Sequence, residues 1–277
     1  MALNCTPFDP DWLGFDYIFF DCDSTLSTIE GIDELARQKG KFDEIKRLTD
    51  AAMDGEVHLE NVYDHRLELL CPTRAEIQAV AEAYRQTLVP DARRVIEALK
   101  EAKKEVFIVS GGLLAAVRPF GEWLGVPTDH IRAVDVRYNK LSGQWWDYQL
   151  DLWGQRSDEE YLDPEITPLI ESQGKADVVK DLLGDRVGRS VLIGDGMSDI
   201  AARPAVDMVV GFGGVIVRDR VKTEADIYIA ASTLAPVLPL ALSLAERARL
   251  SSVSARQTLE KGVDILKTAV YFKEKKL

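Results

Sequence analysis

The 277-residue chain is poor in several features, and each scarcity excludes a class of protein. Its three cysteines, Cys5, Cys22 and Cys71, show no paired spacing, so we expect a reducing compartment and a cytoplasmic protein. The first residues lack a basic segment followed by an apolar one, so we expect no signal peptide. No uncharged apolar run reaches membrane-spanning length, because the candidate at residues 234–245 is short and contains two prolines. The chain is therefore expected to work without a membrane.

Positive charge is also in deficit. The chain has 34 Lys and Arg against 46 Asp and Glu, which gives a formal net charge of −12. This acidic field repels phosphate backbones, so general nucleic-acid binding is not expected. A small anionic substrate could still bind, but only through local positive groups or a metal ion.

The chain does contain a series of short apolar runs, and the segments between them have apolar residues at helical spacing. The runs at residues 17–20, 106–109 and 190–193 predict buried strands, and shorter ones follow at 208–211 and 226–230. Strands that alternate with helices predict an α/β fold with right-handed crossovers. We therefore expect a Rossmann-like, doubly wound parallel sheet as the core.

The stretch after the first strand has only helical spacing, beginning with a helix at residues 32–38. Residues 31–88 are thus predicted to be an inserted α-helical cap domain. Residues 1–30 and 89–245 would form the core, and residues 246–277 a C-terminal helical extension.

Three further segments have weaker patterns. Residues 131–138 and 144–150 resemble a hairpin, and residues 153–168 are polar and proline-punctuated, which predicts a loop. From Leu234 onward two helices are expected, the second with an apolar seam that either folds back on the core or joins two copies. The sequence is therefore compatible with a monomer and with a homodimer. The seam comprises Leu259, Val263, Leu266 and Val270, and the aromatic residues Trp145, Trp146, Tyr148 and Trp153 are expected to pack within the hairpin rather than to stack on a ligand.

The first strand ends in Asp21-Cys22-Asp23-Ser24-Thr25. Alternation along an extended backbone places Asp21 and Asp23 on one face, where two like charges repel unless a cation or a shared proton relieves them. Asp21 is our candidate nucleophile, and Asp23 could protonate the leaving alkoxide and later activate water. A plain polar turn is the alternative interpretation.

Two other strands also end in polar clusters, and the carboxyl ends of parallel strands meet at one edge of a sheet. In the cluster 194–199, Asp195 would supply a second carboxylate for Mg²⁺. Asp199 is expected to contact the metal ligands rather than the ion itself. Capping of a helix that begins at Ile200 is the alternative for Ser198 and Asp199.

The cluster Ser110-Gly111-Gly112 resembles an anion-binding nest at a helix N-terminus, with a flexible turn as the alternative. Lys175 follows a glycine at the start of a predicted helix. Because acidic and phosphate-binding clusters are predicted nearby, Lys175 is expected to neutralise the transferred phosphoryl group. A solvated surface lysine is the alternative.

These four motifs, in this order, resemble those of the haloacid dehalogenase superfamily of phosphatases over residues 16–230. The resemblance implies an inserted helical cap and a Mg²⁺ ion bound by Asp21, Asp195 and the backbone carbonyl of Asp23.

Within the superfamily, the chain is similar to members that hydrolyse O-phosphoserine. That resemblance implies that Glu30 faces the substrate ammonium and that Arg66 holds its carboxylate; solvated surface charges are the alternative. Ser198 stands where the family often has asparagine or threonine, and Leu59 where it often has phenylalanine.

Three hypotheses follow. The first is a Mg²⁺-dependent phosphomonoester hydrolase that forms an aspartyl phosphate. The second keeps this chemistry for another small phosphomonoester, or transfers the phosphoryl group to homoserine. The third is a signalling receiver module, which has no use for Asp23 or for a long helical insertion.

Overall fold

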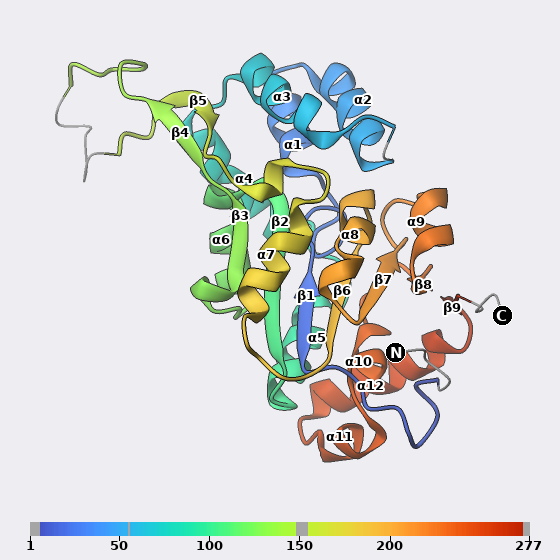
Figure 1. Cartoon of the computed structure of the whole chain (residues 1–277). Helices are drawn as coiled ribbons and strands as arrows, with labels where there is room; N and C mark the ends of the chain where they lie inside the picture. Colours follow the sequence, from blue (N-terminus) through green and yellow to red (C-terminus); the bar gives the residue numbers. More distant parts are fainter. Residues whose placement is uncertain (1–5, 55, 148–154, 274–277) are drawn as a thin grey trace.

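The protein is organised around a seven-stranded sheet in the order β3-β2-β1-β6-β7-β8-β9 (Figure 1). The structure, a computed structural model, describes residues 6–54, 56–147 and 155–273, without the side chain of Leu59. All neighbouring strands are parallel except β8 and β9. The strands are β1 (Tyr17–Phe20), β2 (Glu105–Leu113), β3 (Ile131–Val134), β6 (Ser190–Gly194), β7 (Met208–Phe212), β8 (Ile227–Ile229) and β9 (Val270–Phe272). The predicted Rossmann-like α/β core is confirmed.

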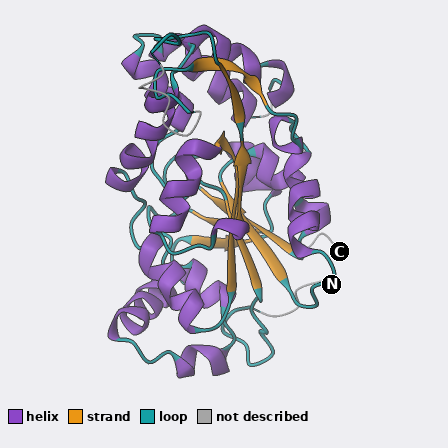
Figure 2. Cartoon of the chain, turned by 90° about the vertical axis from the view of Figure 1, so that its left-hand side faces the viewer, coloured by secondary structure: helices purple, strands orange, loops and turns teal. Residues whose placement is uncertain are grey.

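Helices cover both sides of this sheet (Figure 2). Strand β1 lies between β2 and β6, and all four of its residues are buried, as expected for a central parallel strand. The ring of Phe19 stacks on that of Phe107 with centroids 4.6 Å apart, which ties β1 to β2. The core helices are α5 (Ala92–Glu101), α6 (Leu114–Trp123), α7 (Gly174–Leu183), α8 (Met197–Ala201) and α9 (Asp219–Glu224), with single turns at Thr128–His130, Pro168–Ile170 and Arg203–Ala205.

A helical module stands between β1 and α5 in the chain and beyond the carboxyl ends of the strands (Figure 1). Helix α4 begins with a capping box, in which Thr73 and Glu76 each accept the other's backbone N–H. The module consists of α1 (Gly31–Gln38), α2 (Phe42–Met53), a turn at Leu59–Asn61, α3 (Tyr63–Leu70) and α4 (Arg74–Gln86). The division into cap and core domains stays a prediction.

The predicted hairpin is wrong. Residues 131–134 form β3 of the main sheet, and β4 (Val136–Asn139) pairs antiparallel with β5 (Glu160–Pro164), inside the segment predicted as loop. Residues 144–147 form no strand, and 148–150, with Tyr148 and Trp153, lie outside the described residues. Trp145 and Trp146 contact each other edge to face but are more than half exposed, so they are not packed as expected. The pairing partner lies far along the chain, where local alternation cannot reveal it.

The C-terminal part has more elements than the two helices expected. Its helices are α10 (Val237–Ala241), α11 (Leu244–Arg249) and α12 (Val253–Leu266), followed by β9 on the sheet edge. A capping box at Ser243 and Glu246 begins α11 and divides the predicted first helix. Val270 therefore belongs to β9 and not to the helical seam, while α12 packs on α5 and α10. Among the described residues, no helix combines the length and apolarity needed to cross a bilayer.

Candidate active site

A pocket lies between the helical module and the carboxyl ends of the central strands. Strands β2 and β3 lie on one side of β1 in the sheet, and β6 to β9 lie on the other. The strand order therefore reverses direction at β1, and ligands bind at such a switch point in parallel sheets. Predicted site residues that line the pocket are Asp21, Asp23, Glu30, Arg66, Gly111, Gly112, Lys175 and Ser198. Ser110 and Asp199 are hydrogen-bonded to residues of this lining, and Asp195 lies near Asp21 in the acidic cluster described below. The structure thus brings the predicted site residues together.

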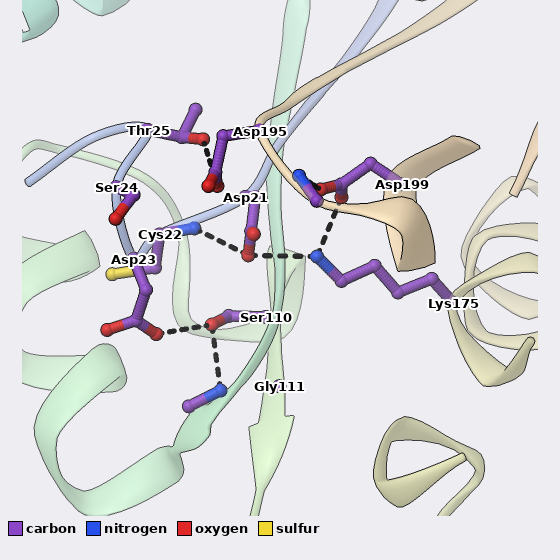
Figure 3. A network of polar contacts seen from close by, with 12 residues as sticks. Asp21, Cys22, Asp23, Ser24, Thr25, Ser110, Gly111, Lys175, Asp195 and Asp199 are labelled. Carbon is purple, nitrogen blue, oxygen red and sulfur yellow. Dashed lines mark hydrogen bonds and ion pairs between the residues drawn. The ribbon is translucent and has the colours of Figure 1, made fainter. Parts of the chain in front are cut away.

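Lys175 connects two buried carboxylates (Figure 3). Its Nζ lies 3.0 Å from Oδ1 of Asp21 and 2.7 Å from Oδ1 of Asp199. Burial alone would lower the pKa of Lys175, but the attraction of Asp199 and Asp21 outweighs it and raises the pKa above its ordinary value. Lys175 therefore carries its positive charge at the centre of the site and is not the solvated surface lysine of the alternative interpretation.

Two glycines make this arrangement sterically feasible. A Cβ at Gly174 would lie 1.6 Å from the carbonyl oxygen of Pro168, so only glycine lets α7 begin where Lys175 can enter the site. A Cβ at Gly194 would lie 2.1 Å from Cγ of Asp199. The glycine at the end of β6 thus makes room for the Asp199 carboxylate.

Asp21, Asp195 and Asp199 form an acidic cluster, with one carboxylate oxygen of each within 4.8 Å of the others. Burial raises the pKa of Asp21 well above its usual value, and Asp199 and Asp195 add to this against the opposing effect of Lys175. Burial raises the pKa of Asp195 to about 6, although nearby Arg218 counteracts it. Hard carboxylate oxygens gathered in this way suit Mg²⁺.

Arg218, which was not predicted from the sequence, is buried in the loop between β7 and α9. Its Nε lies 3.3 Å from Oδ2 of Asp195, and its Nη1 donates to Oδ1 of Asp54 over 2.7 Å. Asp54 follows the last residue of α2, so Arg218 joins the acidic cluster to the helical module. A search for polar residues after the end of β7 would have included this arginine.

The carboxylate of Asp23 is held from three sides. Its Oδ1 accepts the Gly31 N–H at 2.7 Å and the Tyr84 hydroxyl at 2.6 Å, and its Oδ2 accepts the Ser110 hydroxyl at 3.4 Å. Burial raises the pKa of Asp23, while the hydrogen bonds from Tyr84 and Gly31 oppose that rise. Tyr84 carried no sequence signal, because an aromatic residue at helical spacing indicates core packing.

The predicted nest at a helix N-terminus does not have the expected form. Strand β2 runs through Ser110, Gly111 and Gly112 to Leu113, with an irregular register after Val109, and α6 begins only afterwards. The Ser110 hydroxyl accepts the Gly112 N–H at 2.9 Å and bonds to Asp23. Gly111 and Gly112 therefore line the pocket as an irregular strand end, and the buried Ser110 lies behind them against Asp23.

Two opposite charges come from the side of the helical module. Oε1 of Glu30 accepts the Ser24 hydroxyl at 2.6 Å, and burial raises the pKa of Glu30 well above its usual value. Nη1 of Arg66 donates to Oγ1 of Thr49 over 3.0 Å. Glu30 and Arg66 are only 6% and 4% exposed, so neither is the solvated surface charge of the alternative interpretation.

The remaining predicted residues lie on α8 and in the turn at Leu59–Asn61. Ser198 lines the pocket within α8, which begins at Met197, so Ser198 does not cap a helix that starts at Ile200. Asp199 accepts the N–H of Gly196, the residue before α8, at 3.0 Å in addition to the Lys175 ammonium. The side chain of Leu59 lies outside the part of the chain that is described.

Comparison with known proteins gives a consistent result. The model of the haloacid dehalogenase-like hydrolase family matches residues 18–202. Phosphoserine phosphatases of Bos taurus and Homo sapiens are each 32% identical to this chain over 216 residues, covering 77% of this chain and 88% of theirs. A solved structure of a phospho-aspartyl intermediate analogue of phosphoserine phosphatase is similar with a TM-score of 0.65 and 26% identity, over 80% of this chain and 97% of that one. The chain therefore belongs to the haloacid dehalogenase-like hydrolases and is a phosphatase, an enzyme that hydrolyses phosphoric monoesters.

Proposed function

We propose that the enzyme is a Mg²⁺-dependent phosphoserine phosphatase that converts O-phosphoserine and water to serine and phosphate through an aspartyl phosphate. The observation that carries the proposal is the pairing of buried Glu30 and Arg66 in one pocket with Asp21 and Lys175. Phosphoserine presents a phosphate, an ammonium and a carboxylate. A pocket lined by a nucleophile and its cation together with a further acidic and a further basic side chain complements all three groups. The names of the similar relatives support this substrate.

In this proposal an oxygen of Asp21 attacks phosphorus, and the bond between phosphorus and the serine oxygen breaks. Asp23 donates a proton to the leaving serine oxygen and afterwards takes one from the water that attacks the aspartyl phosphate. Lys175 offsets charge on the phosphoryl oxygens. Ser110, Gly111, Gly112 and Ser198 bind these oxygens, and all of them except the adjacent Ser110 line the pocket. The enzyme returns with Asp21 free and Asp23 in its starting protonation state.

The carboxylates of Asp21 and Asp195, with the backbone carbonyl of Asp23, would hold the Mg²⁺ ion. Asp199 belongs to the acidic cluster, but its oxygens accept the Lys175 ammonium and the Gly196 N–H, so we assign it a positioning role. When bound, the ion offsets the repulsion within the cluster and between the cluster and the phosphate.

A substrate panel with and without Mg²⁺ tests the proposal. It compares O-phosphoserine with phosphocholine and a sugar phosphate, beside the variant Asp21→Asn. We expect phosphoserine to have the highest kcat/KM, release of many equivalents of phosphate per enzyme, and no turnover by the variant. A preference for a substrate without an amino-acid moiety would contradict the proposed substrate. One equivalent of stable protein phosphorylation would instead favour the receiver hypothesis.

We keep the sequence-based prediction of a cytoplasmic enzyme. Its support is that Cys22 and Cys71 are both free thiols in the described structure. The prediction for the oligomeric state remains either a monomer or a homodimer.

A further inference from the structure

We propose that Thr49 is a positioning residue that sets the orientation of Arg66 and thereby the preference for substrates that carry a carboxylate. The inference rests on the proposed function, because it concerns how the same pocket would select phosphoserine. Thr49 lies in α2, is fully buried and is not among the residues that line the pocket. Any effect on the substrate must therefore pass through another residue.

The hydroxyl of Thr49 occupies the middle of a directed chain of hydrogen bonds. Nη1 of Arg66 donates to Oγ1 of Thr49 over 3.0 Å, and Oγ1 of Thr49 lies 3.1 Å from Oδ1 of Asp33. A guanidinium can only donate and an ionised carboxylate can only accept. The single hydroxyl proton must therefore point to Asp33, which leaves the lone pairs of Thr49 facing Arg66.

The far end of this chain is also anchored. Nζ of Lys46 lies 3.9 Å from Oδ2 of Asp33 and 2.6 Å from Oδ1 of Asp50. Asp33 comes from α1, Thr49 and Lys46 from α2, and Arg66 from α3. The network thus ties three helices of the module together behind the guanidinium.

Arg66 also carries a hydrogen-bond donor that is unused in the described structure. Its side chain lines the pocket, is 4% exposed, and carries an Nε for which the described structure provides no hydrogen-bond partner. A buried unsatisfied donor is costly, and a planar carboxylate is the group that a guanidinium binds best with two of its N–H groups. Because Thr49 already fixes one edge of the guanidinium, less conformational freedom is lost when a carboxylate binds at another edge.

Two substitutions isolate the hydroxyl. Thr49→Val keeps the branched shape and removes the hydroxyl, whereas Thr49→Ser keeps the hydroxyl. Each is assayed with O-phosphoserine and with O-phosphoethanolamine, which has the same phosphate and ammonium but no carboxylate. KM is measured, or the competitive inhibition constant where turnover is slow. For Thr49→Val we expect KM for phosphoserine to rise about tenfold, the scale of one hydrogen bond to a charged group, and KM for phosphoethanolamine to change less than about twofold. Thr49→Ser should restore the value for phosphoserine.

Thr258→Val is the matched control, since Thr258 is a buried threonine of α12 whose hydroxyl has no hydrogen-bond partner in the described structure. The same chemical change there should leave both KM values within about twofold of the wild type, below one hydrogen bond. Comparing two substrates on one preparation also removes the effect of partial misfolding, which would lower kcat for both.

The outcomes separate this inference from the proposed function. A wild type that selects phosphoserine over phosphoethanolamine, with a Thr49→Val variant that selects it equally well, overturns the inference alone. Equal losses on both substrates also overturn it, because Thr49 would then act through general packing. A wild type that does not distinguish the two substrates overturns the proposed substrate and the inference together.

Discussion

Nζ of Lys175 lies 3.0 Å from Oδ1 of Asp21, so the candidate nucleophile and its balancing cation reach each other from two separate elements of the core. Without the ammonium, Asp21 would be buried beside Asp195 and Asp199, and its pKa would rise further. A protonated carboxyl is a poor nucleophile. We therefore expect Lys175→Met to lower kcat by at least about 10³-fold, on the scale of losing a central electrostatic stabiliser.

Steady-state kinetics with a circular dichroism spectrum of the folded variant would check this. Lys180→Met is the control, because Lys180 lies on the same helix and its side chain is 54% exposed. A Lys175→Met variant that retains more than about a tenth of the wild-type kcat, a loss far below the expected scale, would rule out the assigned role.

The ion pair between Arg218 and Asp54 should hold the helical module against the core. Asp54→Asn and Arg218→Met should each raise KM, and the double variant should be no worse than the poorer single one, because both changes break the same contact. For Asp54→Asn we expect about a threefold to fivefold rise, since its side chain is 44% exposed and the pair is partly screened. Hydrogen exchange of α2 should become faster. Additive effects on KM would indicate that the two residues act separately.

Metal dependence should follow the acidic cluster. We expect a chelator to abolish turnover and added Mg²⁺ to restore it. Mg²⁺ should also raise Tm, because a ligand that binds only the folded state stabilises it. Asp195→Asn should weaken Mg²⁺ binding in calorimetry by about tenfold or more and reduce the shift in Tm, because it removes one charged ligand. Full activity in the chelator would exclude a metal-dependent mechanism.

The C-terminal helix should contribute to stability through its buried face. Leu266 is 2% exposed at the end of α12, which packs on α5 and α10. Leu266→Ala should cost about 2–4 kcal/mol of unfolding free energy and lower Tm by roughly 4–12 °C. Val253→Ala, on the same helix at 71% exposure, is the control and should change Tm by less than about 2 °C. Equal shifts for both variants would mean that α12 is not docked as described.

The sequence predicted the parts of the fold that depend on local patterns. Strands β1, β2 and β6 are short apolar runs, and the rule that parallel strands end at one edge was enough to bring Asp21, Ser110 and Asp195 together. Pairing between distant segments could not be predicted in this way. Strand β4 pairs with β5 across a long connection, and β9 returns to the sheet after three helices.

The residues of the site also differ in whether a local sequence pattern could predict them. Residues in motifs directly after strands were identified, whereas residues that enter from elsewhere were missed. Tyr84 has the spacing of a core aromatic residue, and Arg218 and Asp54 meet only when the loop after β7 approaches the end of α2. No periodicity in a single sequence encodes such a contact.

The most direct test of the account is to trap the covalent intermediate. The enzyme is mixed with phosphorus-labelled phosphoserine and Mg²⁺, quenched in acid within milliseconds, and digested for peptide mapping. We expect acid-stable label on the peptide that contains Asp21, its loss on a chase with unlabelled substrate, and no label on the Asp21→Asn variant. Turnover without label on Asp21, or label on another residue, would contradict the central claim that Asp21 is the nucleophile.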